Sequence, residues 1–279
     1  MEPELAAAWA VEPAVLAGAL LALGLFAQGF VRLRRRGRRD HAPLWRAVLF
    51  VLATTLAVLA LVSPLDAIGE EELLSAHMLQ HVVIGDLVAA LVVVSLRGPL
   101  LFFLLPPAAL RAVGRRRAVR GTLAFLLRPQ VSLGIWLATF AAWHVPAAYD
   151  SALGNPLVHD LEHVTFMLAG ILFWTQLVDP ARRRALSGAG QFGLALVVFA
   201  AGQALANTLV FAPRPLYPAY AGDGERLLGL SPYSDQAGAG LIMMGEMVLT
   251  IGTWTAYRLR AHFRPPLALP ETERHPFAL

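Results

Sequence analysis

Seven long apolar segments run through this chain of 279 residues, and they limit its fold more than any other feature. A helix needs about 20 apolar residues to cross a membrane, and only helices or closed barrels satisfy their backbone polar groups in lipid. Charged residues make up only 15% of the chain, against about 25% in soluble domains. We therefore predict an all-α polytopic membrane helix bundle, a single integral membrane domain over residues 1–279 in contact with lipid, with spans at about 13–31, 44–63, 73–96, 130–148, 157–178, 189–211 and 236–257.

The arginines are unevenly distributed among the connections between these spans. Connections 32–43, 97–129 and 179–188 are rich in arginine, whereas the other three hold two arginines between them and are rich in Asp and Glu. The positive-inside rule then places the N-terminus outside and the C-terminus in the cytoplasm. The apolar run in segment 98–128 is too short to cross a membrane. We therefore expect an interfacial or re-entrant piece followed by a basic amphipathic helix.

Five histidines fall at the outer ends of three predicted spans. His77 and His81 open the third span, His144 closes the fourth, and His159 and His163 open the fifth. Residues four apart share a helix face, so each pair can offer two imidazoles to one ligand. One alternative is that each is an interfacial histidine bonded to a carbonyl or headgroup, but imidazole is the commonest metal ligand among side chains. We expect a shared metal or haem site at the outer face.

The last span adds thioethers and polar groups at the same end. Asp235 and Gln236 stand at its outer end, and Met243 and Met244 follow about two turns below. Thioether sulfur suits Cu(I), and imidazole suits copper in both oxidation states. Ordinary packing is the alternative for the methionines, because Met fills irregular gaps in cores.

Three of the carboxylates within the spans bear on this site. Asp86 and Glu246 are deeper than the histidines, and Glu162 lies between the paired histidines of the fifth span, where it can orient an imidazole. Asp86 and Glu246 indicate either a polar track for protons or metal, or interhelical hydrogen bonding with Gln203 and Asn207 as possible partners.

Several classes of function are excluded by what the chain lacks. There is no cysteine, so thiolate metal sites and thiol nucleophiles are absent. The basic residues cluster between spans, which is a topological pattern and indicates no nucleic-acid partner. No HExxH motif, nucleophile–base set or phosphate-binding loop is present, so we expect no enzyme.

Four motifs in order resemble one known family. HMLQH at 77–81, WHVPAAYDSAL at 143–153, HDLEHVTFMLAGILFW at 159–174 and SDQAGAGLIMM at 234–244 are similar to the polytopic, seven-helix CtaG family of cytochrome c oxidase assembly factors. The resemblance covers about residues 40–260. It implies a multi-pass protein of the bacterial plasma membrane that helps to mature a haem–copper oxidase by handling copper. The implied partners are an oxidase subunit and a soluble extracytoplasmic copper donor.

These observations together predict a copper-handling assembly factor with a His/Met site on the outer face. Two rival functions stay open at this point. The first is a bis-His haem b protein that carries electrons, because histidines on facing helices can bind haem axially. The second is a copper or proton transporter that uses Asp86 and Glu246.

Overall fold

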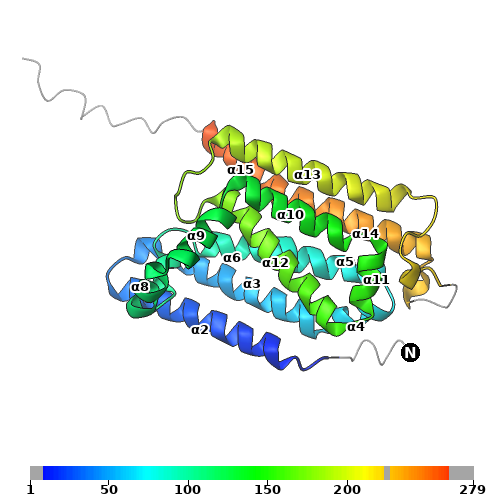
Figure 1. The fold of residues 1–279 in the computed structure, drawn as a ribbon, viewed down its shortest axis with the longest axis horizontal. Coiled ribbons are helices and arrows are strands. Elements are labelled where there is room, and N and C mark those ends of the chain that lie inside the picture. The colour runs from blue at the N-terminus through cyan, green and yellow to red at the C-terminus, as the bar shows by residue number, and fades with distance from the viewer. Residues whose placement is uncertain (1–8, 223–226, 264–279) are drawn as a thin grey trace, which may run out of the picture.

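The computed structural model describes residues 9–222 and 227–263, and every regular element within these ranges is helical. Long helices lie side by side in one bundle, which confirms the predicted all-α class (Figure 1). The α-helices are α2 (Pro13–Arg35), α3 (Leu44–Val62), α4 (Pro64–Glu71), α5 (Leu74–Val82), α6 (Ala89–Ser95), α7 (Leu100–Phe103), α8 (Pro107–Arg115), α9 (Arg117–Leu126), α10 (Pro129–Trp143), α11 (Pro146–Leu153), α12 (Pro156–Val178), α13 (Gly188–Phe211), α14 (Pro232–Met247) and α15 (Thr253–His262).

Six helical stretches of the described residues are long and apolar enough to cross a membrane, or seven if the bent pair α9 and α10 is one span. α9 and α10 are bent by 71° relative to each other. α10 alone has 15 residues and ends at Trp143, before the predicted limit of 148. Pro146 explains the early end, because proline disfavours helical backbone in the residue before it; Val145 is extended and α11 begins at Pro146.

Two of the spans contain a π-helical turn. The turn η2 (Val83–Val88) joins α5 to α6, and η5 (Val248–Gly252) joins α14 to α15. Asp86 lies in η2 and Thr250 in η5, and the Thr250 hydroxyl is 2.9 Å from Asp86 Oδ2. The two irregular turns therefore face each other inside the bundle, and such turns are frequent at functional sites.

Segment 98–128 forms three short helices, none of which is long enough to cross a membrane. α7 has 4 residues, α8 has 9 and α9 has 10, and neither α8 nor α9 contains a buried residue. The single basic helix expected here is thus two helices, separated where Arg116 takes an extended backbone conformation.

The exposed surface around the bundle carries large apolar side chains. Leu20, Leu157 and Leu249 are each more than two-thirds exposed, while polar side chains such as His77, Gln80 and Glu162 are fully buried. An exposed apolar surface of this kind suits lipid as the surrounding medium. Together with the candidate spans, it identifies a multi-pass membrane protein.

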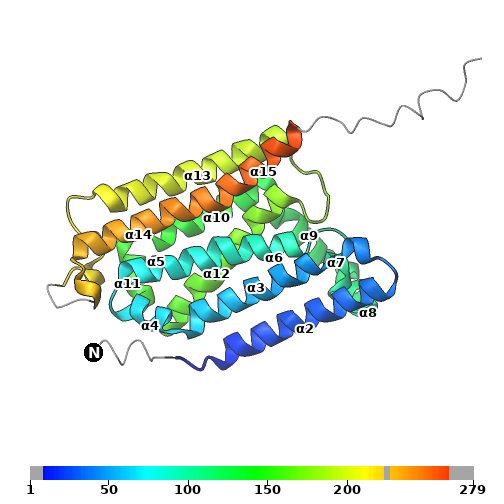
Figure 2. The same cartoon turned by 180° about the vertical axis from the view of Figure 1, so that it is seen from behind.

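The two ends of the bundle differ in charge and in the residues that they present. The arginine-rich connections 32–43, 97–129 and 179–188 lie at one end, while α4 and α11 lie at the other (Figures 1 and 2). α5 and α12 both begin at the end with α4 and α11, and α10 ends there, so the histidine-bearing ends are together. The assignment of this end to the outside of the cell stays a prediction from the arginines.

Candidate metal centre

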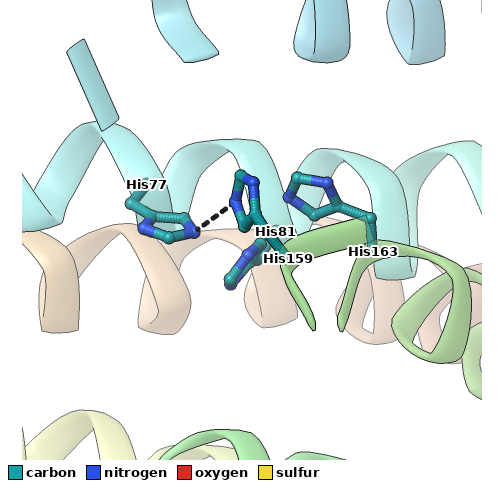
Figure 3. Close-up of side chains that lie close together, drawn as sticks. All are labelled: His77, His81, His159 and His163. Atoms are coloured by element: carbon teal, nitrogen blue, oxygen red, sulfur yellow. Dashed lines mark hydrogen bonds between the residues drawn. The ribbon is translucent and has the colours of Figure 1, made fainter. Parts of the chain in front are cut away.

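Four histidines from two neighbouring helices meet in the interior of the bundle. His77 and His81 on α5 lie beside His159 and His163 on α12 (Figure 3). One ring nitrogen from each of the four lies within 4.8 Å of the others, and His77 Nε2 is 3.3 Å from His159 Nε2. All four are at most 6% exposed. The two pairs expected from the sequence therefore converge on a single point.

Glycines allow the two histidine-bearing segments to come this close. A Cβ atom added to Gly170 of α12 would lie 1.7 Å from the carbonyl oxygen of Gly85 in η2. A Cβ atom at Gly85 would lie 3.3 Å from Cβ of Phe166. Small residues at a helix crossing let backbones touch, as is common in membranes. This contact lies below the histidines and determines how far apart α5 and α12 are held.

Polar side chains hold the first turns of both helices. Asp235 of α14 accepts hydrogen bonds from the backbone N–H groups of Leu74 (2.8 Å) and Ser75 (3.0 Å) at the start of α5. Asn155 accepts one from Leu157 (3.0 Å) at the start of α12. The first N–H groups of a helix lack partners within the helix, and a carboxylate there also complements the helix dipole. Asp235, expected near the metal, thus positions the helix that carries His77 and His81.

Gln236 also forms hydrogen bonds to backbone groups at this end of the bundle. Its Oε1 accepts from the backbone N–H of Leu216 (2.6 Å), and its Nε2 donates to the carbonyl oxygen of Leu209 (3.0 Å). It therefore ties α14 to the end of α13 and to the connection that follows.

Some ring nitrogens of the four histidines have a polar partner in the protein, and others have none. His159 Nδ1 is 2.5 Å from Glu70 Oε1, and His77 Nδ1 is 3.1 Å from the Tyr220 hydroxyl. Both nitrogens of His81 and Nε2 of His163 are buried and have no hydrogen-bond partner in the described structure. An unsatisfied buried polar group costs about 1–3 kcal/mol, so several in one place need a reason. A bound cation would supply it.

Glu162 places a carboxyl group beside the rings. Both of its carboxylate oxygens are buried without a hydrogen-bond partner among the described residues, and Oε1 is 3.8 Å from His81 Nε2, too far for a hydrogen bond. A buried carboxylate needs a compensating charge or polar partner. A metal ion held by the histidines would provide that charge.

The spacing of the rings fits a metal ion. Two imidazole nitrogens bound to one tetrahedral ion at about 2.0–2.1 Å lie roughly 3.3 Å apart. The distance of 3.3 Å between the Nε2 atoms of His77 and His159 equals this separation. Small movements of the other two rings would complete the coordination.

His144 and Met243 lie outside this group of four. His144 Nδ1 is 2.7 Å from the carbonyl oxygen of Phe140, and the ring lines a cavity that it shares with His81 and Met243. Met244 is not among the lining residues and packs against the core around Leu209. The structure therefore separates the predicted His/Met set into a histidine cluster and a neighbouring cavity.

The deeper carboxylates have other partners than those expected. Thr250 Oγ1 is 2.9 Å from a carboxylate oxygen of both Asp86 and Glu246, and Trp174 Nε1 donates to Asp86. The amides of Gln203 and Asn207 instead donate to the carbonyl oxygens of Met244 and Gln203. Interhelical hydrogen bonding is thus present at Asp86, but with Thr250 and Trp174 as partners, because the π turns bring Asp86 and Thr250 face to face.

Sequence reasoning missed four residues around the histidines. Asp66 and Glu70 on α4 are four apart, and this spacing in the acidic connection was a signal that we could have used. Met78 lies within HMLQH, between the two histidines of that motif. Tyr220 comes from a distant connection and gives no local signal.

Asp66 provides a test based on pH. Burial is the main cause that raises its pKa to about 6, and the nearby Glu70 also raises it, while a hydrogen bond from Gln80 opposes this. Since the pKa in the folded protein exceeds the ordinary value, the stabilisation belongs to the neutral form and is lost as pH rises through about 6. We therefore expect the melting temperature of Asp66→Asn, minus that of the wild type, to be larger at about pH 7 than at about pH 5.

The measurement is thermal unfolding of both proteins in detergent with a metal chelator at the two pH values. Glu71→Gln, an exposed position on the same helix, is the matched control and should show no such gain. An equal difference between Asp66→Asn and wild type at both pH values would contradict the prediction.

Comparison with known proteins gives one match. A family model described as cytochrome c oxidase caa3 assembly factor (Caa3_CtaG) matches residues 24–260, which include all the histidines of the cluster and the cavity. No curated protein and no solved structure matches the chain.

Proposed function

Because the chain belongs to the family of cytochrome c oxidase caa3 assembly factors, we propose that it handles copper for the oxidase at the cluster of His77, His81, His159 and His163. Copper is here the cargo that the protein receives and passes on. The observation that carries this proposal is the convergence of four buried imidazoles with nitrogens within 4.8 Å of one another. The role is one of binding and transfer, without a reaction catalysed by the chain.

The donor set supports copper. The chain has no cysteine, so imidazole, thioether and oxygen ligands are what it offers, and imidazole binds copper in both oxidation states. Only neutral imidazole can coordinate a metal, and a buried site disfavours protonated rings. Glu162 beside the rings would balance part of the charge of the ion.

The surroundings of His159 support a route from the surface. Glu70 contacts His159 Nδ1 and its side chain is 38% exposed, while Asp66 lies on the same face of α4. Carboxylates at the mouth of a site attract cations and raise their local concentration. Copper from a soluble donor would meet Glu70 first and the histidines next.

Haem b fits this cluster less well than a metal ion. Axial nitrogens on either side of a haem iron must leave room for the porphyrin between them, whereas the His77 and His159 nitrogens are 3.3 Å apart. The adjoining cavity of about 50 Å³ is also far smaller than the several hundred Å³ of typical cofactor sites.

The experiment that tests the function is deletion of the gene in the native host, followed by complementation. Deletion should leave the oxidase subunits present but deficient in copper and in activity, and the wild-type gene should restore both. His77→Ala and His163→Ala should fail to restore them and should each lower copper bound to the purified protein, measured by elemental analysis. His262→Ala, an exposed histidine on α15, is the matched control and should behave as wild type.

Normal oxidase copper in the deletion strain would overturn the assembly role in copper delivery. Unchanged metal content in both histidine variants would overturn the assignment of the cluster.

A further inference from the structure

A cavity of about 50 Å³ lies beside the histidine cluster, deeper in the bundle. A water molecule occupies about 30 Å³ in the liquid, so this space is large enough for a water or a metal ion. Its wall includes His81, which also belongs to the cluster of four. The two places are therefore contiguous through one side chain.

Three helices each present one stripe of side chains to this cavity. α5 contributes Met78 and His81, η2 contributes Asp86, the end of α10 is followed by His144, and α14 contributes Met243 and Glu246. Spacings of three and four residues place side chains on one helix face. Phe166 of α12 closes the remaining side.

Four of these side chains carry donor atoms suited to a soft metal. His81 has two buried nitrogens without a partner, and His144 has a free buried Nε2 because its Nδ1 is held at Phe140. Met78 and Met243 are buried, with exposures of 1% and 4%. Met247 is different, since its thioether end lies against Gly202 on α13.

Carboxyl groups that can balance a cation lie at the deep end of the same cavity. Asp86 and Glu246 both line it, and Thr250 lies 2.9 Å from an oxygen of each. A cation in an apolar cavity within a membrane needs such a counter-charge. Two thioethers, two imidazoles and a nearby carboxylate pair form an environment that favours Cu(I) over harder divalent ions.

We propose that this cavity is a second metal site, specific for Cu(I), in which Met78, Met243, His144 and His81 are the ligands. The inference rests on the proposed function and deepens it: the protein holds copper at two adjacent positions, and His81 can ligate the ion in either. When both are filled, His81 serves the cavity, and His77, His159 and His163 hold the other ion. Copper received at the histidine cluster would move to the thioether site by ligand exchange at His81, without any change in the oxidation state of Cu(I).

The test is metal titration of the purified protein with two probes, Cu(I) under reducing, oxygen-free conditions and Zn(II). Zinc prefers nitrogen and oxygen donors to thioethers, so it reports the histidine cluster alone. The wild type should bind about two equivalents of Cu(I) and about one of Zn(II). The double variant Met78→Leu/Met243→Leu should lose about one equivalent of Cu(I) and keep its Zn(II), because leucine preserves the apolar volume.

Met244→Leu is the matched control, since it makes the same change one residue away and outside the cavity wall, and it should bind both metals as wild type does. A double variant that keeps all its Cu(I) would overturn the second site. Should that variant fail to fold, X-ray absorption of the wild type loaded with Cu(I) decides the matter: a sulfur shell around copper supports the site, and its absence overturns it.

His159→Ala separates this proposal from the proposed function. Loss of Zn(II) together with retention of the sulfur-bound Cu(I) supports both. A wild type that binds about one Cu(I) through nitrogen alone, lost in His159→Ala, overturns the second site and leaves the histidine cluster standing. Zn(II) binding unaffected by His159→Ala would overturn the histidine cluster, whatever the thioether variant shows.

Discussion

Gly170→Ala should separate the two helices that carry the histidines and abolish high-affinity metal binding. The added Cβ would lie 1.7 Å from the carbonyl oxygen of Gly85, and no side-chain rotation can relieve contact with a backbone atom. α12 would have to move by roughly 2 Å to reach an ordinary contact distance. We expect a loss of about 3 kcal/mol or more of folding free energy, which exceeds the gain from alanine in a helix of about 1 kcal/mol at most.

The measurements are the yield of monodisperse protein after extraction, its melting temperature, and Zn(II) affinity of whatever folds. Gly193→Ala on α13 is the matched control, because nothing lies within 4 Å of the added atom. It should be neutral or slightly stabilising. A Gly170→Ala protein with wild-type melting temperature and wild-type metal affinity would show that α5 and α12 are not held by this contact.

Asp235→Ala should destabilise the protein by about 3 kcal/mol and weaken metal binding without removing any ligand. The substitution leaves the backbone N–H groups of Leu74 and Ser75 without their shared acceptor. Leu74 is 1% exposed, so water cannot simply take the place of the carboxylate. Since His77 lies in the first turn of α5, fraying of that turn would displace one ring of the cluster.

Asp235→Asn distinguishes the two contributions of the carboxylate. An amide keeps one acceptor oxygen and loses the charge that complements the helix dipole, so it should retain part of the stability. The measurements are melting temperature, hydrogen exchange at the amides of Leu74 and Ser75, and Zn(II) affinity. Faster exchange confined to another helix, with these two amides unchanged, would contradict the role assigned to Asp235.

The spans were predictable because each depends on local composition. A run of about 20 apolar residues has few alternatives to a membrane helix, and the arginine-rich connections separate one run from the next. The exceptions are also local in origin. α10 is shorter than expected because Pro146 stops it, and the basic helix expected in the second part of segment 98–128 is two helices, α8 and α9, preceded by the short α7.

The site was predictable in part. The spacing of four residues in HMLQH and HDLEH indicated two imidazole pairs, and the common end of their spans indicated that they could meet. His144, on the other hand, lies beside the cluster and lines the cavity, and Asp235 caps α5. Whether a residue at a helix end coordinates a ligand or caps a neighbour depends on the rotation of each helix about its axis.

The sequence by itself determined the class of fold, the apolar spans and the end of the bundle where the histidines gather, because these follow from hydropathy and spacing within single segments. Only the tertiary structure decided that four of the five histidines share one point. It also determined that Asp86 contacts Trp174 and Thr250, and that Met243 lines the cavity whereas Met244 does not. The physical reason is that helix rotation and depth are set by close packing between distant segments, as at Gly85 and Gly170, and by irregular turns such as η2 and η5. Apolar runs of similar composition carry no signal of such contacts.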